Sequence, residues 1–121
     1  MGAFTPQVDL VAGLVEIRTT FHTRDAALAC AERLVRDRLA ACVQIDGPIT
    51  STYWWQGAVE RADEWRLVGK TTGAARGACI AAIVGGHAYE TPQVVVVPIE
   101  ASAAYAAWIA GAVRSGPAVG L

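Results

Sequence analysis

ACVQIDGPITSTYWWQGAVERADEWRLVGKT, residues 41–71, is the stretch that decides the fold. β-Branched and aromatic residues dominate residues 41–55 and 65–71, which favours two β-strands. Asp46-Gly47-Pro48 favours a bend inside the first strand, and residues 56–58 favour a turn after it. We place the polar residues between this turn and the second strand at or near the hairpin. The stretch therefore predicts a long, bent strand that pairs directly with the next one.

One strand and one helix are predicted upstream of this hairpin. Residues 14–20 are short, β-branched and alternate between apolar and charged side chains, which is typical of a strand. Thr23 can cap the segment that follows. Within residues 24–38 the apolar residues keep helical spacing, and the charged residues fall on the other side. We expect a strand at residues 14–20 and a helix at residues 24–38.

A second helix is predicted directly after the hairpin. Thr71 or Thr72 is expected to cap it, and its alanine-rich sequence continues to about Val84. Gly85 and Gly86 are expected to end it, because glycine adopts the left-handed turn that a helix end often requires.

A loop, a strand and a third helix are predicted in the last part of the chain. The loop covers residues 87–92, and the strand covers the apolar run QVVVVP at residues 93–98. Such a continuous run is typical of a strand that is covered on both faces. Ser102 is expected to cap a helix over residues 103–113. Its large side chains are expected on one stripe: Tyr105, Trp108, Ile109 and Val113.

The order of these elements predicts an α+β fold of the ferredoxin-like type, β-α-β-β-α-β with an additional C-terminal helix. In this plan an antiparallel sheet carries both main helices on one face. The other face needs a cover, and a neighbouring subunit is the source that we expect. We assign a single domain to residues 13–115, a loose leader to residues 1–12 and a flexible tail to residues 116–121.

The composition excludes several classes of partner. Charged residues make up 17% of the chain and apolar residues 54%, which indicates subunit interfaces. The net charge is −1, with acidic and basic residues interspersed, so neither nucleic acid nor a membrane surface is an expected partner. Charges interrupt every apolar stretch before the roughly 18 residues that a membrane span needs. The first twelve residues lack the features of a secretory signal, so we expect a cytoplasmic protein.

The three cysteines are expected to be free, buried thiols. Cys30, Cys42 and Cys79 are odd in number and far apart, and no Cys-x-x-Cys pair occurs. Their neighbours are mostly alanine, valine and isoleucine, so they are interpreted as small core residues rather than as ligands for a soft metal.

Four short strings resemble the CutA divalent-cation tolerance family. They are Arg38-Leu-Ala-Ala-Cys-Val43, Ser51-x-Tyr-x-Trp-x-Gly57, Lys70-Thr71 and His87-x-Tyr-Glu-x-Pro92. The resemblance extends from about Leu14 to Val113 and includes the spacing between the strings. It implies a ferredoxin-like subunit, a homotrimer whose sheets face one another, and a role in tolerance of divalent metals, especially copper.

The chain departs from the family pattern where some members are thought to bind copper. The resemblance implies a cysteine late in the first strand and two consecutive histidines before the tyrosine, where this chain has Arg18 and Gly86-His87. The usual proline between the histidine and the tyrosine is Ala88. His87 is thus the one metal-ligand candidate, and a lone imidazole predicts weak copper binding. No cofactor is assigned from the residues themselves, and the resemblance implies a divalent metal such as copper.

Several polar residues are candidates for a ligand site or cleft, each with a structural alternative. His87 is interpreted as a hydrogen-bonded loop anchor, with a role as ligand or general base as the alternative. Tyr89 and Glu90 could complete a polar pocket or could fasten the loop to the sheet edge, and the sequence leaves both open. Lys70 and Tyr53 complete the candidate set. Lys70 also belongs, with Glu16, Arg18 and Arg66, to a group that we interpret as a charge network between subunits rather than as catalytic.

Aromatic residues are concentrated on the hairpin. They are Tyr53, Trp54, Trp55 and Trp65. Base stacking on nucleic acid would need accompanying basic residues, which are missing, so these side chains are interpreted as a subunit interface.

The leading functional hypothesis is a CutA-like, non-enzymatic protein that responds to metal ions. The alternative is a small-ligand sensor that resembles the PII signalling trimers, with its ligand in a cleft between subunits. A weaker third hypothesis is an enzyme with His87 as acid or base and Lys70 as an electrophilic clamp. Nucleophile elbows, phosphate-binding glycine loops and paired carboxylates are not found in the sequence, so no catalytic residue is assigned.

Overall fold

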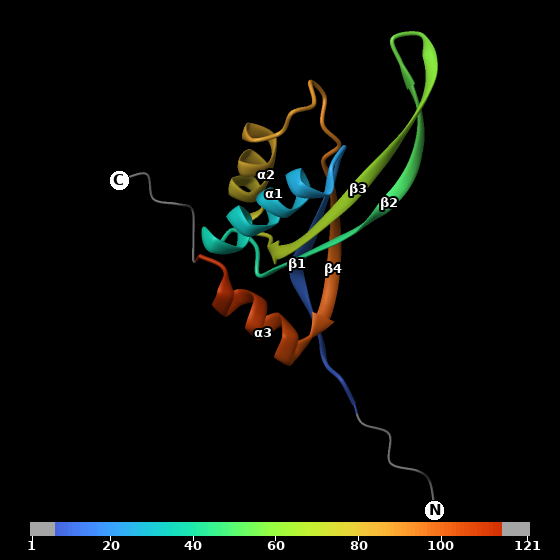
Figure 1. Ribbon diagram of the computed structural model, residues 1–121. Coiled ribbons are helices and arrows are strands. Elements are labelled where there is room, and N and C mark those ends of the chain that lie inside the picture. The colour runs from blue at the N-terminus through green and yellow to red at the C-terminus, as the bar shows by residue number, and fades with distance from the viewer. Residues whose placement is uncertain (1–6, 115–121) are drawn as a thin grey trace, which may run out of the picture.

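Four strands form one antiparallel sheet in the order β2-β3-β1-β4 in the computed structural model, which describes residues 7–114 (Figure 1). The strands are β1 (Leu10–Phe21), β2 (Cys42–Trp55), β3 (Ala58–Thr72) and β4 (Val95–Ser102). The helices are α1 (Arg24–Arg36), α2 (Arg76–Gly85) and α3 (Ala103–Ala112). This order and topology confirm the predicted ferredoxin-like plan with an additional helix. The predicted tail at residues 116–121 lies outside the described residues.

The β2–β3 hairpin is longer than predicted and projects beyond the rest of the sheet (Figure 1). Its pairing runs from Cys42 opposite Lys70 to Trp55 opposite Ala58. Gln56 and Gly57 form the turn, with φ angles of 50° and 80°, as a tight hairpin of this twist requires. The prediction that β3 starts near residue 65 is wrong. The polar first half of β3 is paired with β2 along its whole length. Its polar side chains remain hydrated on the projecting hairpin, so they do not oppose the formation of a strand.

The predicted bend in β2 is present at Asp46, where the pairing register shifts before it resumes at Ile49. The peptide bond between Gly47 and Pro48 is cis. A Cβ atom on Gly47 would lie 2.7 Å from Cδ1 of Trp65, so the backbone of β2 passes very close to this indole ring. The bend therefore depends on a residue without a side chain.

The first strand begins earlier than predicted. β1 starts at Leu10, so assigning residues 10–12 to a loose leader is wrong, and residues 1–6 lie outside the described part of the chain. Gly13 has a φ of 94°, and the register with β4 shifts between Val11 and Leu14. Such a bulge interrupts the alternation of side chains, which explains why the sequence pattern appeared to start only after it.

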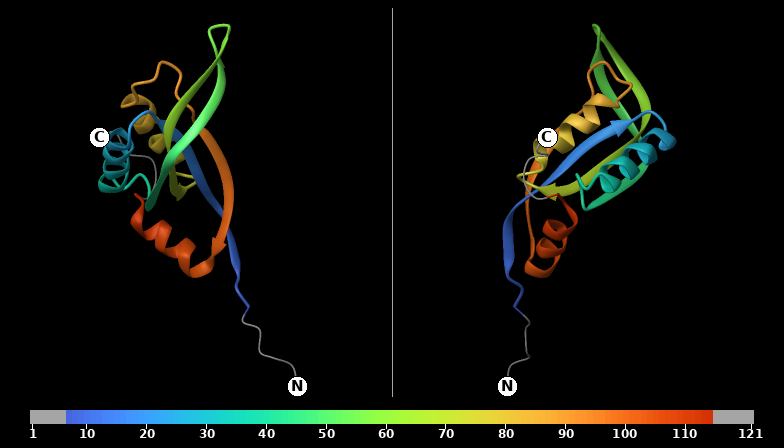
Figure 2. Two further views of the ribbon diagram at one scale, coloured as in Figure 1. Left: turned by 45° about the vertical axis from the view of Figure 1, so that its right-hand side comes forward. Right: turned by 90° about the vertical axis from the view of Figure 1, so that its left-hand side faces the viewer.

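The main core lies between the sheet and helices α1 and α2, which lie on the same side of the sheet (Figure 2). Ile17 of β1 and Leu67 of β3 have no exposed area, and they pack with Leu34 of α1 and Ile83 of α2. The buried hydroxyl of Thr71 donates a hydrogen bond of 2.6 Å to the carbonyl oxygen of Leu39, so this polar group is satisfied inside the core. The alternation in β1 and β3 thus separates a side that faces α1 and α2 from a second face, on which α3 packs against Leu14.

The helix ends agree with the predictions in part. The side chain of Thr23 accepts a hydrogen bond of 3.1 Å from the Ala26 amide, which confirms the predicted cap of α1. The predicted cap of α2 is wrong, because Thr72 accepts from the Ala75 amide in a turn that precedes the helix. The predicted left-handed exit is also wrong, since Gly86 has a φ of −105°. A turn at residues 73–75, which the alanine-rich pattern concealed, moves the start of the helix.

Helix α3 packs around Leu14 near the ends of β1, β3 and β4. Ser102 caps it by accepting from the Tyr105 amide at 3.4 Å, as predicted. The predicted stripe is wrong for the two aromatic residues, because Tyr105 and Trp108 stack on each other at the surface with ring centroids 5.5 Å apart. Every residue of α3 is apolar or glycine, so the pattern could not show which side faces the core.

The structure can also be compared with the predictions for the three cysteines and for β4. Cys30 and Cys79 are buried, Cys42 is half-buried, and all three are free thiols. Burial raises the pKa of the Cys79 thiol to about 12, so this thiol is inert near neutral pH. The β4 strand is not covered on both faces by residues 7–114, because Val95 is 43% exposed. Any second cover must come from outside these residues.

Candidate functional site

His87 anchors the loop between α2 and β4 to the end of β1. Its Nδ1 accepts a hydrogen bond of 3.1 Å from the Tyr89 amide, so Nε2 carries the proton and donates to the carbonyl oxygen of Thr20 at 2.8 Å. The imidazole ring also stacks on Phe21, with centroids 4.4 Å apart and planes inclined by 11°. Both ring nitrogens are therefore engaged. This geometry agrees with the interpretation of His87 as a loop anchor.

Tyr89 joins the same loop to β3. Its hydroxyl group donates a hydrogen bond of 2.8 Å to Oε2 of Glu64, a residue that is only 8% exposed. Burial, reinforced by the neighbouring carboxylate of Glu64, raises the pKa of the Tyr89 phenol well above its ordinary value. Tyr89 consequently stays neutral and remains a hydrogen-bond donor at physiological pH.

A pocket of about 520 Å³ lies beside this hydrogen bond. The walls come from the start of the projecting half of the hairpin, from the end of β1 and from the loop before β4. The lining residues are Thr20, Ser51, Thr52, Tyr53, Trp55, Glu64, Tyr89, Glu90, Thr91 and Gln93. The pocket thus brings together three of the predicted candidates, Tyr53, Tyr89 and Glu90, which are distant in sequence.

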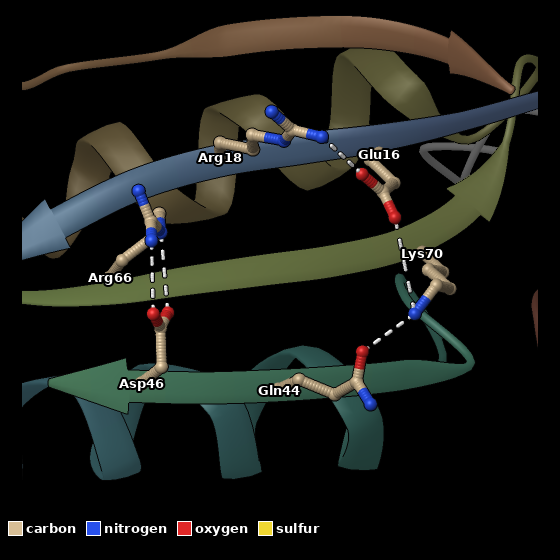
Figure 3. A network of polar contacts seen from close by, with 6 residues as sticks. All are labelled: Glu16, Arg18, Gln44, Asp46, Arg66 and Lys70. Carbon is tan, nitrogen blue, oxygen red and sulfur yellow. Dashed lines mark hydrogen bonds and ion pairs between the residues drawn. The ribbon is translucent and has the colours of Figure 1, made fainter.

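Lys70 does not line this pocket. Its Nζ lies 2.6 Å from Oε1 of Gln44 and 4.0 Å from Oε2 of Glu16, on the face of the sheet opposite α1 and α2 (Figure 3). Arg18 pairs with the same Glu16 carboxylate at 2.7 Å. Glu16, Arg18 and Lys70 of the predicted charge group thus interact within one chain, together with Gln44 of β2. Closure of this network between subunits stays a prediction.

The fourth member of the predicted charge group, Arg66, forms a separate ion pair. Arg66 makes two hydrogen bonds to Asp46, of 3.2 and 2.9 Å, across the β2–β3 pair (Figure 3). The hydrogen bonds of this guanidinium lower the pKa of the Asp46 carboxyl. Arg66 is therefore already neutralised by its own partner.

The four aromatic residues of the hairpin have different environments. Tyr53 and Trp55 line the pocket, and Trp54 is 74% exposed. Trp65 packs against the core cluster on the helix side of the sheet, so it belongs to the interior of its own chain. Alternation along β3 explains this position, because Trp65 and the buried Leu67 share one side of the strand.

Sequence reasoning missed Glu64, the most deeply buried acidic residue of the described chain. The sequence places Glu64 among the polar residues of the hairpin, and a run of charged residues does not indicate which member is buried. The sequence pattern places Thr20 in a strand and Ser51 in a family motif, but it gives neither hydroxyl group a role at a site. The closure of the loop at Tyr89 over β3 is a long-range contact that local patterns do not encode.

The described residues contain no cluster of three or more metal-binding side chains. No group of at least three His, Cys, Asp or Glu residues with the required proximity occurs within residues 7–114. In the same range, no helix is both long and apolar enough to cross a membrane. His87 would have to give up one of its two hydrogen bonds to bind a metal ion.

Comparison with known proteins gives consistent results in sequence and structure. Residues 15–112 match the family described as CutA1 divalent ion tolerance protein. The chain is 37% identical over 91 residues to the divalent-cation tolerance protein CutA of Thermus thermophilus, covering 74% of this chain and 88% of that protein. It is 35% identical over 94 residues to a probable CutA homologue of Encephalitozoon cuniculi, covering 77% of this chain and 82% of that protein.

Solved structures give the same result. CutA from Synechococcus elongatus is similar with a TM-score of 0.81 and 35% identity, over 88% of this chain and 96% of that chain. A protein of Archaeoglobus fulgidus, described as a periplasmic divalent cation tolerance protein CutA, is similar with a TM-score of 0.80 and 32% identity, over 84% of this chain and 99% of that chain.

Proposed function

The chain belongs to the CutA1 divalent ion tolerance family, and from this we propose that it acts in tolerance of divalent cations without catalysing a reaction. The observation that carries the proposal is the family match over residues 15–112, which spans nearly all of the described fold. A shared fold alone would not support a function, but here sequence and fold point to the same family.

The geometry supports a non-enzymatic role. An acid or base and an electrophilic clamp would have to approach the same substrate. His87 is engaged at the end of β1, whereas Lys70 belongs to the network with Glu16 and Gln44 and does not line the pocket. The two groups that the enzyme hypothesis required are therefore not arranged around a common space.

We propose further that the protein works as a homotrimer in the cytoplasm. Large apolar side chains are exposed in the single chain on the hairpin and on β4, for example Trp54, Val59 and Val95. Burying them between subunits would remove them from water. The compartment is part of this proposal, and the Archaeoglobus relative is described as periplasmic.

The proposed function predicts a growth phenotype. In a bacterial strain that lacks its own family member, expression of this chain should restore growth in medium with raised copper(II), because the protein would act on the response to that cation. The measurement is the copper concentration that halves the growth rate, with an empty vector as control. Equal sensitivity with and without the chain, at confirmed protein levels, would refute the function.

Direct copper binding is expected to be weak. His87 supplies one imidazole, and a copper ion must replace one of its hydrogen bonds, each of which contributes about 0.5 to 1.5 kcal/mol. Calorimetric titration should give a Kd above about 1 μM, and His87→Ala should remove most of the remaining heat. His22→Ala is the matched control, because His22 is exposed near Tyr89. Tight, stoichiometric binding that survives His87→Ala would contradict this expectation and direct attention to the cysteines.

A second candidate function is ligand sensing, as in the PII-like alternative. The observation that favours it is the pocket beside Glu64 and Tyr89, whose volume of about 520 Å³ is typical of small-molecule sites. The two functions are compatible, because a sensor of a small molecule can also alter tolerance of metal ions. They differ in what binds to the protein, which can be measured.

A further inference from the structure

We propose that the pocket beside Glu64 binds a small organic cation with an ammonium group, and that Glu64 is the carboxylate that receives this group. The inference names a ligand class for the second candidate function, but it rests only on the residues that line the pocket.

The charged residues of the lining are all acidic. Glu64 and Glu90 line the pocket, and no lysine, arginine or histidine does so among the described residues. The nearest basic residue along β3, Arg66, is bound to Asp46 by two hydrogen bonds. Two carboxylates without a basic counterpart create a negative potential, which attracts cations and repels phosphates and carboxylates.

Glu64 has capacity for a further partner. Its Oε2 accepts the hydrogen bond from Tyr89, and the carboxylate forms no ion pair within residues 7–114. A carboxylate that is 8% exposed loses most of its hydration, and this loss is costly unless a donor or an opposite charge compensates for it. The Tyr89 hydroxyl provides one hydrogen bond but no charge. An ammonium group in the pocket would provide both.

The walls suit an organic cation. Tyr53, Trp55 and Tyr89 contribute aromatic rings, whose faces attract an ammonium group or the methylene groups next to it. The hydroxyl groups of Thr20, Ser51, Thr52 and Thr91 can exchange hydrogen bonds with polar substituents of the ligand. A lining of this kind binds polar, positively charged molecules in preference to apolar ones.

A bare metal ion fits less well than an organic ligand. A metal ion of any kind needs several ligand atoms at fixed, short distances, and the described residues contain no group of three or more His, Cys, Asp or Glu side chains that could supply them. A volume of about 520 Å³ exceeds the space that one ion requires and lies within the range of small-molecule sites. Size and lining therefore point to the same class of ligand.

The test uses three probes that share a four-carbon chain and a terminal hydroxyl group and differ at the other end. These are 4-amino-1-butanol, 1,4-butanediol and 4-hydroxybutyrate, which carry an ammonium, a hydroxyl and a carboxylate group. Each is titrated into the native protein at pH 7.5 with a metal chelator present, and binding is followed by nuclear magnetic resonance and by thermal shift. We expect saturable binding and a rise in Tm only for the amine.

Glu64→Gln is the decisive variant. It keeps the shape of the side chain and an acceptor for Tyr89, but it removes the charge, so the affinity for the amine should fall at least about tenfold. Glu100→Gln on β4 is the matched control, because Glu100 is exposed and does not line the pocket, and it should leave the affinity unchanged. Circular dichroism shows whether each variant is folded.

Three results would overturn the proposal. They are equal binding of the diol, no saturable binding of the amine up to about 50 mM, and unchanged affinity in a folded Glu64→Gln variant. If that variant does not fold, the three probes on the native protein still decide the question. Because the chelator removes metal ions, a negative result here leaves copper tolerance untouched, and a failed growth test leaves this site untouched.

Discussion

Gly47→Ala should lower the free energy of unfolding by roughly 2 to 6 kcal/mol, the sum of two costs of about 1 to 3 kcal/mol each. The first is backbone strain, because residue 47 has a φ of 155°, which residues with a side chain rarely adopt. The second is steric, because the new Cβ would lie 2.7 Å from Cδ1 of Trp65 and 3.0 Å from the carbonyl oxygen of Glu64. Urea denaturation at a fixed protein concentration measures the change.

Gly77→Ala is the matched control for this substitution. Gly77 lies in α2, and nothing is within 4 Å of the position of its missing Cβ. Alanine is the better helix former, so this variant should gain about 0.5 to 1 kcal/mol. If Gly47→Ala instead stayed within about 0.5 kcal/mol of the native protein, the bend in β2 would be able to shift away from the indole ring. The proposed need for glycine at this bend would then be wrong.

The native protein should scatter light as a trimer at micromolar concentration, with three times the mass of the 12.7 kDa chain. Trp54→Ala should shift this assembly toward smaller species, because Trp54 is 74% exposed in a single chain and is proposed to be buried by a neighbouring subunit. Truncation of a well-buried tryptophan costs about 3 to 5 kcal/mol, and a threefold assembly repeats this loss in every subunit. Light scattering over a dilution series measures the shift.

Trp108→Ala is the control for the loss of a large surface side chain. Trp108 is 51% exposed on α3, away from the hairpin, and its truncation should change the assembly less than Trp54→Ala does. A native protein that scatters as a monomer would contradict the trimer. A native trimer that Trp54→Ala leaves intact on dilution would keep the assembly but exclude the tip of the hairpin from its interface.

The sequence was sufficient to predict the order and type of the elements, because the signals for them are local. Alternation in β1, helical spacing in α1 and the cap at Thr23 each depend on residues within a few positions of one another. The boundaries were less predictable. A bulge at Gly13 concealed the start of β1, and the hydrated polar half of β3 resembled a loop. These errors arise where a strand breaks the usual pattern without ending.

The candidate site could be predicted only in part. Tyr53, Tyr89 and Glu90 were selected from their sequence context, and they line one pocket. Their relation to Glu64 could not be foreseen, because the hydrogen bond from Tyr89 joins residues 25 positions apart. Lys70 is a candidate because it belongs to a family motif, but in the structure it pairs with Glu16 and does not line the pocket. Whether a single charged residue is buried depends on the tertiary fold, so a local sequence pattern does not indicate it.

The position of β1 in the sheet has a consequence for synthesis on the ribosome. β1 is made first, but it lies between β3 and β4, and β4 begins only at Val95. Until that segment has emerged, one edge of β1 has no partner, and its unpaired amide and carbonyl groups are open to other chains. Pairing of β1 on both edges therefore has to wait until β4 has been translated. During this delay the open strand edge favours pairing with other chains over folding.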